Sequence, residues 1–379
     1  MRVLFLFSIF CFISFFNFSQ NNPLTIIDGE LILYYPNGSI MEKGYLRNTK
    51  RNGDYFQYYD NGQLKLKSFY TDGILNDEWL LYYSNGNLNS KCLYRNGKII
   101  GQFTNYFENG APKEIFNYDE NRLNGDYINY NSDGEIVVKG KYLNGLKTGI
   151  WNYFYNNGQL EQSISYANGL IHGKLDVYFE TGQKKSSSIY FNDSLDNVQF
   201  YYWPNGKVQS EAYFSRGLRD GKFIIYNENG FILVKSNYKN DILNGIKEEF
   251  SDSNKLLTTE NFIDGKKQFE ARYYYLSGNV FQKGQFKDDL KEGEWFEYFE
   301  SGILSKKLNY KNGKLTGEYI DYYNDGRIEE KGQYLNDLKV GIWRVYFYYK
   351  DEVFESVGTF NDGIKSEDWQ TYKLKNLDN

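Results

Sequence analysis

The sequence predicts an all-β protein, an elongated single-layer antiparallel meander of about fourteen hairpin repeats of 24 residues, twisted or coiled along its length. Two columns carry this prediction, a column being the set of residues at equivalent positions of successive repeats. Every 24th residue from Gly38 to Gly326 is glycine except Asn254, and every 24th residue from Tyr34 to Tyr346 is aromatic. Many of the glycines follow asparagine, and Asn-Gly between two β-prone runs is a strong hairpin signal.

Residues 1–20 lie outside the repeats and are typical of a secretory signal peptide. Arg2 is followed by an apolar run over residues 3–16 and then by a short polar exit. The run is short for a bilayer span, so an uncleaved anchor is the less favoured alternative. A lipid-modified Cys11 is also less favoured, because Phe10 precedes it where a small side chain is expected. We therefore expect export, to the periplasm, the outer membrane or the extracellular space.

The numbers of charged residues and cysteines limit the partners and the covalent cross-links that we expect. The chain has 44 basic and 49 acidic side chains, and removal of residues 1–20 leaves 43 basic ones and a net charge of −6. No basic block occurs, so nucleic acid is not an expected partner. Cys92 is the one cysteine after the signal peptide, so no intramolecular disulfide is expected.

The array is expected to span residues 31–375, after a short lead-in at 21–30. Hairpin tips are expected near residues 38, 62, 86, 110, 134, 158, 182, 206, 230, 254, 278, 302, 326 and 350. An Asn-Gly tip predicts a two-residue type I′ turn, which needs positive φ at both positions. The second hinge of each repeat, as from Asn96 to Gly101, is expected to be a longer glycine-bearing loop into the next hairpin.

The tip turn fixes a register between the two strands of a hairpin. A two-residue turn at Asn61-Gly62 places Tyr59 opposite Leu64 and Tyr55 opposite Ser68. The Tyr55 column is mostly aromatic and its partners are mostly small, so we expect this face to be the packed one. The expected structural core is Trp79, Trp151, Trp295, Trp343 and Trp369.

One repeat departs from this rule. Lys247 replaces the core aromatic, and its expected partner is Glu260, a residue of opposite charge. Asn254 and Phe269 replace glycines of the same region, so we expect the weakest part of the array between Lys247 and Phe269.

The opposite face carries the Tyr58 column, which has two interpretations. Its rings could simply pack against those of neighbouring repeats, or they could form a half-exposed stripe that stacks on sugars or anchors a partner's side chains. The candidate binding stripe is Tyr58, Tyr82, Tyr106, Tyr130, Tyr178, Tyr202, Tyr226, Tyr274, Tyr298 and Tyr322.

The repeated unit, clearest over residues 149–160, reads Gly-x-Trp-x-x-aromatic-Tyr-x-Asn-Gly-x-Leu. It resembles the MORN-repeat family, in particular the bacterial variant repeat of YwqK-type antitoxin-like proteins, over about residues 31–375. The resemblance implies a β-repeat fold and either a protein-binding scaffold, a membrane-associating protein or an antitoxin. It implies no catalytic residues.

Nothing in the residues indicates catalysis, a metal or a cofactor. His172 is the single histidine and stands where other repeats have loop residues, and Cys92 falls in the small-residue column. We expect a non-catalytic exported scaffold that binds proteins through an aromatic-rich β surface. The alternatives are a glycan- or peptidoglycan-binding envelope protein and an antitoxin-like neutralising protein, and membrane association stays open.

Overall fold

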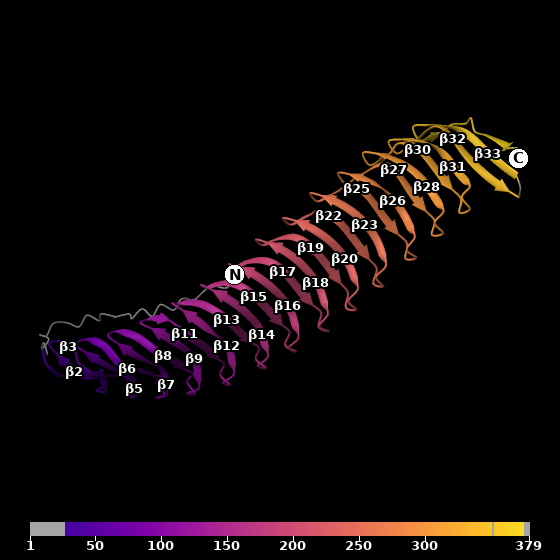
Figure 1. Ribbon diagram of the computed structural model, residues 1–379. Coiled ribbons are helices and arrows are strands. Elements are labelled where there is room, and N and C mark those ends of the chain that lie inside the picture. Colours follow the sequence, from indigo (N-terminus) through magenta and orange to yellow (C-terminus); the bar gives the residue numbers. More distant parts are fainter. Residues whose placement is uncertain (1–26, 351, 375–379) are drawn as a thin grey trace. The chain divides into compact units, whose positions relative to one another are not determined.

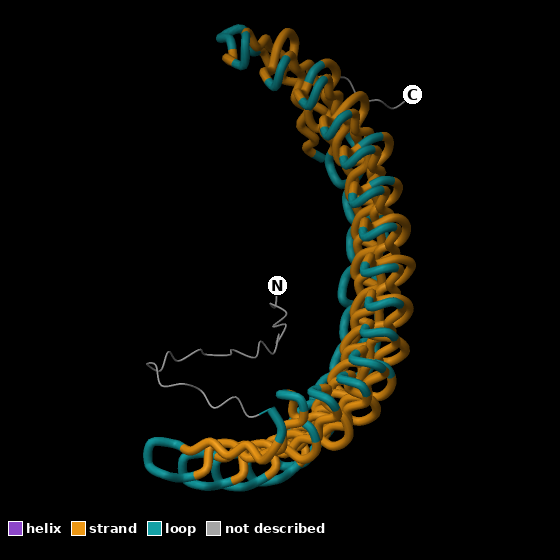
Figure 2. The backbone as a smooth tube through the Cα atoms, turned by 90° about the vertical axis from the view of Figure 1, so that its left-hand side faces the viewer, coloured by secondary structure: helices purple, strands orange, loops and turns teal. Residues whose placement is uncertain are grey.

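The computed structural model describes residues 27–350 and 352–374, which form strands and turns and no helix (Figures 1 and 2). The 35 strands of these residues belong to one antiparallel sheet, which confirms the predicted all-β meander. The expected signal peptide at residues 1–20 lies outside the described residues. The first strand, β1, begins at Gly29, inside the expected lead-in at 21–30.

The chain divides into two compact units, which we describe separately. Unit 1 takes the described residues up to Lys113 and Asn117–Asn121, and unit 2 takes Glu114–Phe116 and the described residues from Arg122 onward. The strands of unit 1 are β1 (Gly29–Tyr34), β2 (Ile40–Arg47), β3 (Lys50–Arg51), β4 (Gly53–Tyr58), β5 (Leu64–Thr71), β6 (Ile74–Tyr82), β7 (Leu88–Arg95) and β8 (Lys98–Tyr106), and β9 (Pro112–Asp119) is divided between the units.

Unit 2 repeats the same pattern of consecutive antiparallel hairpins. Its strands are β10 (Arg122–Leu123), β11 (Gly125–Tyr130), β12 (Ile136–Leu143), β13 (Leu146–Phe154), β14 (Leu160–Ala167), β15 (Leu170–Tyr178), β16 (Lys184–Phe191), β17 (Ser194–Tyr202), β18 (Val208–Ser215), β19 (Leu218–Tyr226), β20 (Ile232–Lys239), β21 (Ile242–Leu243), β22 (Gly245–Phe250), β23 (Leu256–Ile263), β24 (Lys266–Lys267), β25 (Phe269–Tyr274), β26 (Val280–Lys287), β27 (Leu290–Tyr298), β28 (Leu304–Lys311), β29 (Lys314–Leu315), β30 (Gly317–Tyr322), β31 (Ile328–Leu335), β32 (Leu338–Tyr349), β33 (Glu352–Asn361), β34 (Ile364–Lys365) and β35 (Gln370–Leu374).

The hairpin tips from residue 38 to residue 326 are not the predicted two-residue turns, whereas at the last tip Tyr349 pairs directly with Glu352. Between β4 and β5, the Tyr59 N–H donates to the Gln63 carbonyl at 2.8 Å and the Gly62 N–H donates to the Tyr59 carbonyl at 2.9 Å. Gly62 has a φ of 84°, whereas Asn61 is not among the positive-φ residues. This is a three-residue loop, a type I turn closed by a glycine bulge. The reason lies in Asn61, whose Oδ1 accepts the Gln63 N–H at 3.0 Å and so favours an Asx turn.

The longer loop shifts the register next to the tip. Tyr58, not Tyr59 as predicted, lies opposite Leu64, and the ladder shifts between Gln57 and Tyr58. Beyond the shift the predicted register is confirmed, with Tyr55 opposite Ser68.

The two-residue turns lie at the other end of the hairpins. Arg95 pairs directly with Lys98, and the intervening Asn96 and Gly97 have φ values of 52° and 76°. These are the values of a type I′ turn, so the predicted longer loop is wrong at this hinge. Gly101 belongs to β8, where the ladder with β7 shifts in register.

Five core rings pack over a glycine eleven positions earlier in the chain. The Trp151 ring on β13 covers Gly140 on β12, where an added Cβ would lie 2.2 Å from the indole. In unit 1, Tyr55 covers Gly44 in the same way. The residues at these positions are therefore small because the ring of the next strand occupies the space that a side chain would fill. They also face an aromatic residue across their own hairpin.

Candidate binding surface

The stripe residues close the first strand of each hairpin, one per repeat. All ten are half-buried, in unit 1 and in unit 2 alike. Each ring sits next to the tip because its residue pairs with the aliphatic column, as Tyr58 does with Leu64 and Tyr298 with Leu304. The structure thus places one aromatic side chain with partial solvent exposure in every repeat, which leaves both interpretations of the column available.

Burial and neighbouring charges set the chemistry of the stripe. Burial raises the pKa of Tyr82, Tyr178, Tyr202 and Tyr226, with nearby carboxylates adding to the effect. Their hydroxyls are therefore protonated at neutral pH. Lysine ammonium groups lie 5.5 to 5.8 Å from the ring centroids of some stripe residues, within cation–π range. The pairs in question are Lys91 with Tyr106, Lys184 with Tyr178 and Lys283 with Tyr298.

Where a tyrosine or tryptophan follows the Tyr58-column position, it links neighbouring hairpins, a role that the sequence analysis did not find. Tyr59 donates its hydroxyl hydrogen to the carbonyl of Tyr82 at 2.7 Å, and this contact recurs along both units. The equivalent donors are Tyr35, Tyr83, Tyr155, Trp203, Tyr275 and Tyr323. The signal was present in the sequence as a second aromatic directly after the Tyr58 column.

The expected core residues divide into two groups. Trp151, Trp295 and Trp343 are at most 1% exposed, whereas Trp79 and Trp369 are half-buried. The three buried indoles each donate Nε1–H to a backbone carbonyl at 3.1 to 3.2 Å.

A lysine four residues earlier covers each buried indole. The Nζ atoms of Lys147, Lys291 and Lys339 lie 3.9 to 4.1 Å from the ring centroids of Trp151, Trp295 and Trp343. Burial lowers the pKa of Lys147 and Lys291. These lysines therefore seal the core with their aliphatic stems and a cation–π contact.

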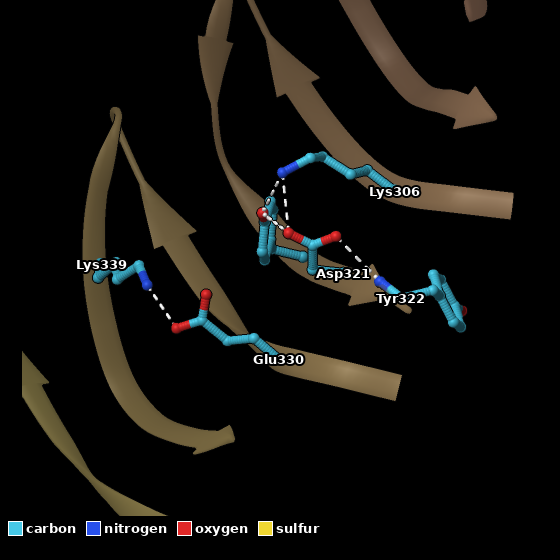
Figure 3. Close-up of polar contacts among 6 residues, drawn as sticks. Lys306, Asp321, Tyr322, Glu330 and Lys339 are labelled. Atoms are coloured by element: carbon cyan, nitrogen blue, oxygen red, sulfur yellow. Dashed lines mark hydrogen bonds and ion pairs between the residues drawn. The ribbon is translucent and has the colours of Figure 1, made fainter. Parts of the chain in front are cut away.

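Paired charges lie beside the core in unit 2 (Figure 3). Lys306 Nζ lies 2.8 Å from Asp321 Oδ2, and the Tyr319 hydroxyl donates to the same oxygen at 3.0 Å. Lys339 and Glu330 form a second pair at 2.6 Å. Burial alone would lower the pKa of Lys306, but its bonds to Asp321 and Tyr319 raise it overall. The groups satisfy one another, so they position strands and offer no free acid or base.

The predicted pairing of Lys247 with Glu260 holds for the backbone only. Their Cα atoms are opposite one another, but the Lys247 ammonium contacts Glu249 at 2.6 Å. Glu260 instead binds Lys267 at 2.6 Å and accepts the Tyr273 hydroxyl at 2.7 Å. The predicted register is therefore confirmed, but the two side chains do not contact each other, because Glu260 turns toward the next strand.

The other candidate reactive groups occupy structural positions. His172 Nδ1 lies 3.1 Å from Asn192 Oδ1, at a hinge. Cys92 is buried, and burial raises its pKa to about 12, so the thiol stays protonated at neutral pH. Within the described ranges no group of three His, Cys, Asp or Glu side chains could hold a metal ion. Over the same residues no helix is long and apolar enough to cross a membrane.

One stretch of the stripe carries a buried carboxylate. Asp176 lies on β15, and its Oδ2 contacts Lys174 Nζ at 3.0 Å and Lys184 Nζ at 3.2 Å. Burial opposes ionisation of Asp176, but Ser187 and the two lysines lower its pKa overall. Its negative charge raises the pKa of Tyr178, so the carboxylate and this stripe residue share one neighbourhood.

Comparison with known proteins places these repeats in a family. Nine segments match the family model described as MORN repeat variant, and together they cover about half of the chain. They are residues 27–48, 51–72, 78–96, 147–168, 195–215, 219–240, 270–288, 291–312 and 315–336. No curated protein sequence matches the chain.

Solved structures give only distant likenesses. A crystal structure of TcdB2-TccC3-Cdc42 matches at 10% identity with a TM-score of 0.14, over 87% of this chain and 23% of that one. A crystal structure of TcdB2-TccC3-TEV matches at 12% identity with a TM-score of 0.16, over 88% of this chain and 21% of that one. The chain thus spans less than a quarter of these proteins, and the spatial overlap is too small to support an inference.

Proposed function

Because the chain belongs to the MORN repeat variant family, we propose that it is an exported, non-catalytic repeat scaffold that binds other proteins through its aromatic-rich β surface. The observation that carries the proposal is the half-buried Tyr58 column, which gives every repeat one ring at the same place. Partly exposed tyrosines with protonated hydroxyls combine apolar area with a hydrogen-bonding tip, the chemistry that protein interfaces favour. The composition of residues 1–20 supports export.

A second candidate is glycan binding. The ion-paired Asp176 beside Tyr178 favours it, because a ring and a neighbouring polar cluster suit the two faces of a sugar. Protein binding is the first choice because the aromatic column extends through all the repeats, whereas Asp176 occurs in one.

A pull-down from envelope extract, run beside co-sedimentation with peptidoglycan, tests the proposal. The double variant Tyr82→Ser with Tyr106→Ser is expected to lose captured protein, whereas the exposed control Lys65→Ser with Lys113→Ser keeps it. Phe103→Ala, on the core face, should instead cost about 3 to 4 kcal/mol of stability. Capture that survives in the stripe variant would make the column a packing element, and co-sedimentation without protein capture would favour the glycan.

A further inference from the structure

We propose that four successive hairpin tips of unit 2 form a docking ridge for a basic amphipathic helix of a protein partner, an inference that rests on the proposed scaffold function. The tips lie at residues 227–231, 251–255, 275–279 and 299–303. The apolar tip ridge consists of Phe231, Leu276, Phe281 and Ile303, which are 45%, 64%, 42% and 36% exposed. Three of them lie in the first, third and fourth tips, Phe281 lies on β26 beside the third, and the tip at 251–255 has no apolar side chain. The nearby Tyr275 ring meets that of Phe281 at 5.3 Å, so apolar surface continues onto the strand.

The repeats provide an internal control for this exposure. The position of Leu276 holds a carboxylate at many other tips, and the position of Phe281 is mostly polar elsewhere. The equivalents of Leu276 include Asp60, Glu108, Glu180, Glu228, Asp252 and Glu300. Those tips form the same three-residue loop. Folding of the loop therefore does not require apolar side chains here, and a contact with another molecule explains their presence.

The charge at the ridge selects the partner. The four tips contain three carboxylates, those of Glu228, Asp252 and Glu300, and one cation, Lys255. Lys207 of the preceding tip adds a second cation, because its Nζ donates to the Asn229 carbonyl at 2.8 Å. The backbone carbonyls of the three acidic residues accept hydrogen bonds from the amides of Asn205, Asn227 and Asn279 at 2.8 to 3.0 Å, which fixes the main chain. Among the described residues, none of the three carboxylates forms an ion pair. They are therefore available to lysine or arginine side chains, and they repel an anionic lipid surface.

The spacing of the tips selects the secondary structure of the occupant. Two strands per repeat at about 4.8 Å each separate successive tips by about 10 Å. Seven residues of an α-helix rise about 10.5 Å, so residues with heptad spacing lie over successive tips on one helix face, where they would meet apolar side chains at the first, third and fourth tips and the polar tip 251–255 between them. Same-face residues of an extended strand recur every ~6.6 Å and do not match.

The test uses the full chain and a fluorescent helical peptide of about 21 residues, three copies of Leu-Lys-Lys-Leu-Leu-Lys-Lys, in an anisotropy titration. We expect Leu276→Ser with Phe281→Ser to weaken binding at least about tenfold, and Glu228→Gln with Asp252→Asn and Glu300→Gln to weaken it at least about threefold at low salt. The control Asn156→Ser with Glu161→Ser changes the equivalent positions of a polar tip and should leave affinity unchanged. Replacing the peptide's Lys by Glu, or its Leu by Ser, should abolish binding.

Two results would overturn the ridge. One is equal affinity of the wild type and the Leu276→Ser, Phe281→Ser variant for the peptide. The other is that the wild type does not bind the peptide but binds phosphatidylglycerol vesicles, and that the Leu276→Ser, Phe281→Ser variant loses the vesicle binding. That result would assign the apolar side chains to a membrane contact. The envelope pull-down distinguishes failure of the ridge proposal from failure of the scaffold function. A partner captured equally by the wild type and the ridge variant would contradict the ridge proposal alone. No capture by the wild type would contradict the scaffold function.

Discussion

At the residue scale, the array is held by pairs whose sizes are matched. A large ring lies over glycine, as Trp151 over Gly140, and where the small Ala271 replaces the ring, the residue eleven positions earlier is the larger Glu260, both of them buried. Both columns are visible in the sequence, but the small residue that each ring covers depends on how each strand packs against the preceding strand. The alternation of side chains between the two faces does not predict this contact.

We expect Gly140→Ala to destabilise unit 2 by about 1 to 3 kcal/mol, because its Cβ would lie 2.2 Å from the Trp151 indole. Gly140 is not among the positive-φ glycines, so the cost is steric. Urea unfolding followed by tryptophan fluorescence and circular dichroism measures it. In the background of Trp151→Leu the same substitution should cost much less, and an equal cost in both backgrounds would rule out the ring contact as the cause.

We expect Phe269→Gly to stabilise the protein by about 1 kcal/mol. Phe269 has a φ of 62° and is 60% exposed, so glycine relieves backbone strain with little loss of buried surface. Gly293→Ala, at a φ of 68° with open space around its Cβ, is the reciprocal control and should destabilise by a similar amount. Chemical unfolding midpoints decide, and a lower midpoint for Phe269→Gly would mean that the ring makes a stabilising contact.

At the element scale, the hairpin was predictable but its turns were not. Asn-Gly suits both a type I′ turn and a type I turn with a glycine bulge, and the sequence does not say whether Asn61 uses its backbone or its side chain. In the structure, Asn61 uses its side chain. The amide donates to the Ser84 carbonyl of the next tip at 3.2 Å, and Oδ1 accepts the Gln63 N–H within the same turn. Register near the tip failed for the same reason, and register from Tyr55 onward held because it depends on the alternation of faces.

The hairpin-to-hairpin tyrosine bonds can be tested on two adjacent residues. Tyr323→Phe removes the hydroxyl that donates to the Tyr346 carbonyl at 3.0 Å, so we expect a loss of about 0.5 to 1.5 kcal/mol. The matched control is Tyr322→Phe, in the stripe, whose hydroxyl makes no hydrogen bond with the described residues. Equal unfolding midpoints for the two variants would remove the hydrogen bond as a source of stability.

At the scale of the whole molecule, many tyrosines depart from their ordinary acidity in the same direction. Burial raises the pKa of Tyr346 to about 12 and that of Tyr55, Tyr127 and Tyr319 above its ordinary value. In the unfolded chain these groups titrate near ~10. Above that pH the folded state holds more protons than the unfolded state, so the stability due to these tyrosines is full below pH ~10 and falls as pH rises.

We therefore expect the melting temperature to drop steeply above pH ~10, in step with delayed formation of tyrosinate in the ultraviolet difference spectrum. Lys147 and Lys291 act in the opposite sense, because their lowered pKa values make stability rise with pH below ~10.5. The tyrosines outnumber them, so the net slope is negative. A melting temperature that is flat across this range would contradict the assignment of raised tyrosine pKa values.

The final prediction concerns where the array opens first. Between Lys247 and Ala271 the aromatic core is interrupted, and the buried Glu260 depends on Lys267 and Tyr273 in its place. The attraction within a buried ion pair offsets little more than the free-energy cost of removing its charges from water, so the pair stabilises the fold less than a tryptophan packed over glycine. The stability of a repeat array is a sum over the contacts between neighbouring repeats. Limited proteolysis of unit 2 should therefore cut first within residues 247–269, and faster in Lys267→Ala, which leaves Glu260 without its cation. Lys339→Ala is the control, since Trp343 stays buried beneath that site. A first cut elsewhere in unit 2, at a rate that Lys267→Ala does not change, would show that this interruption of the aromatic core is not the weakest interface of unit 2.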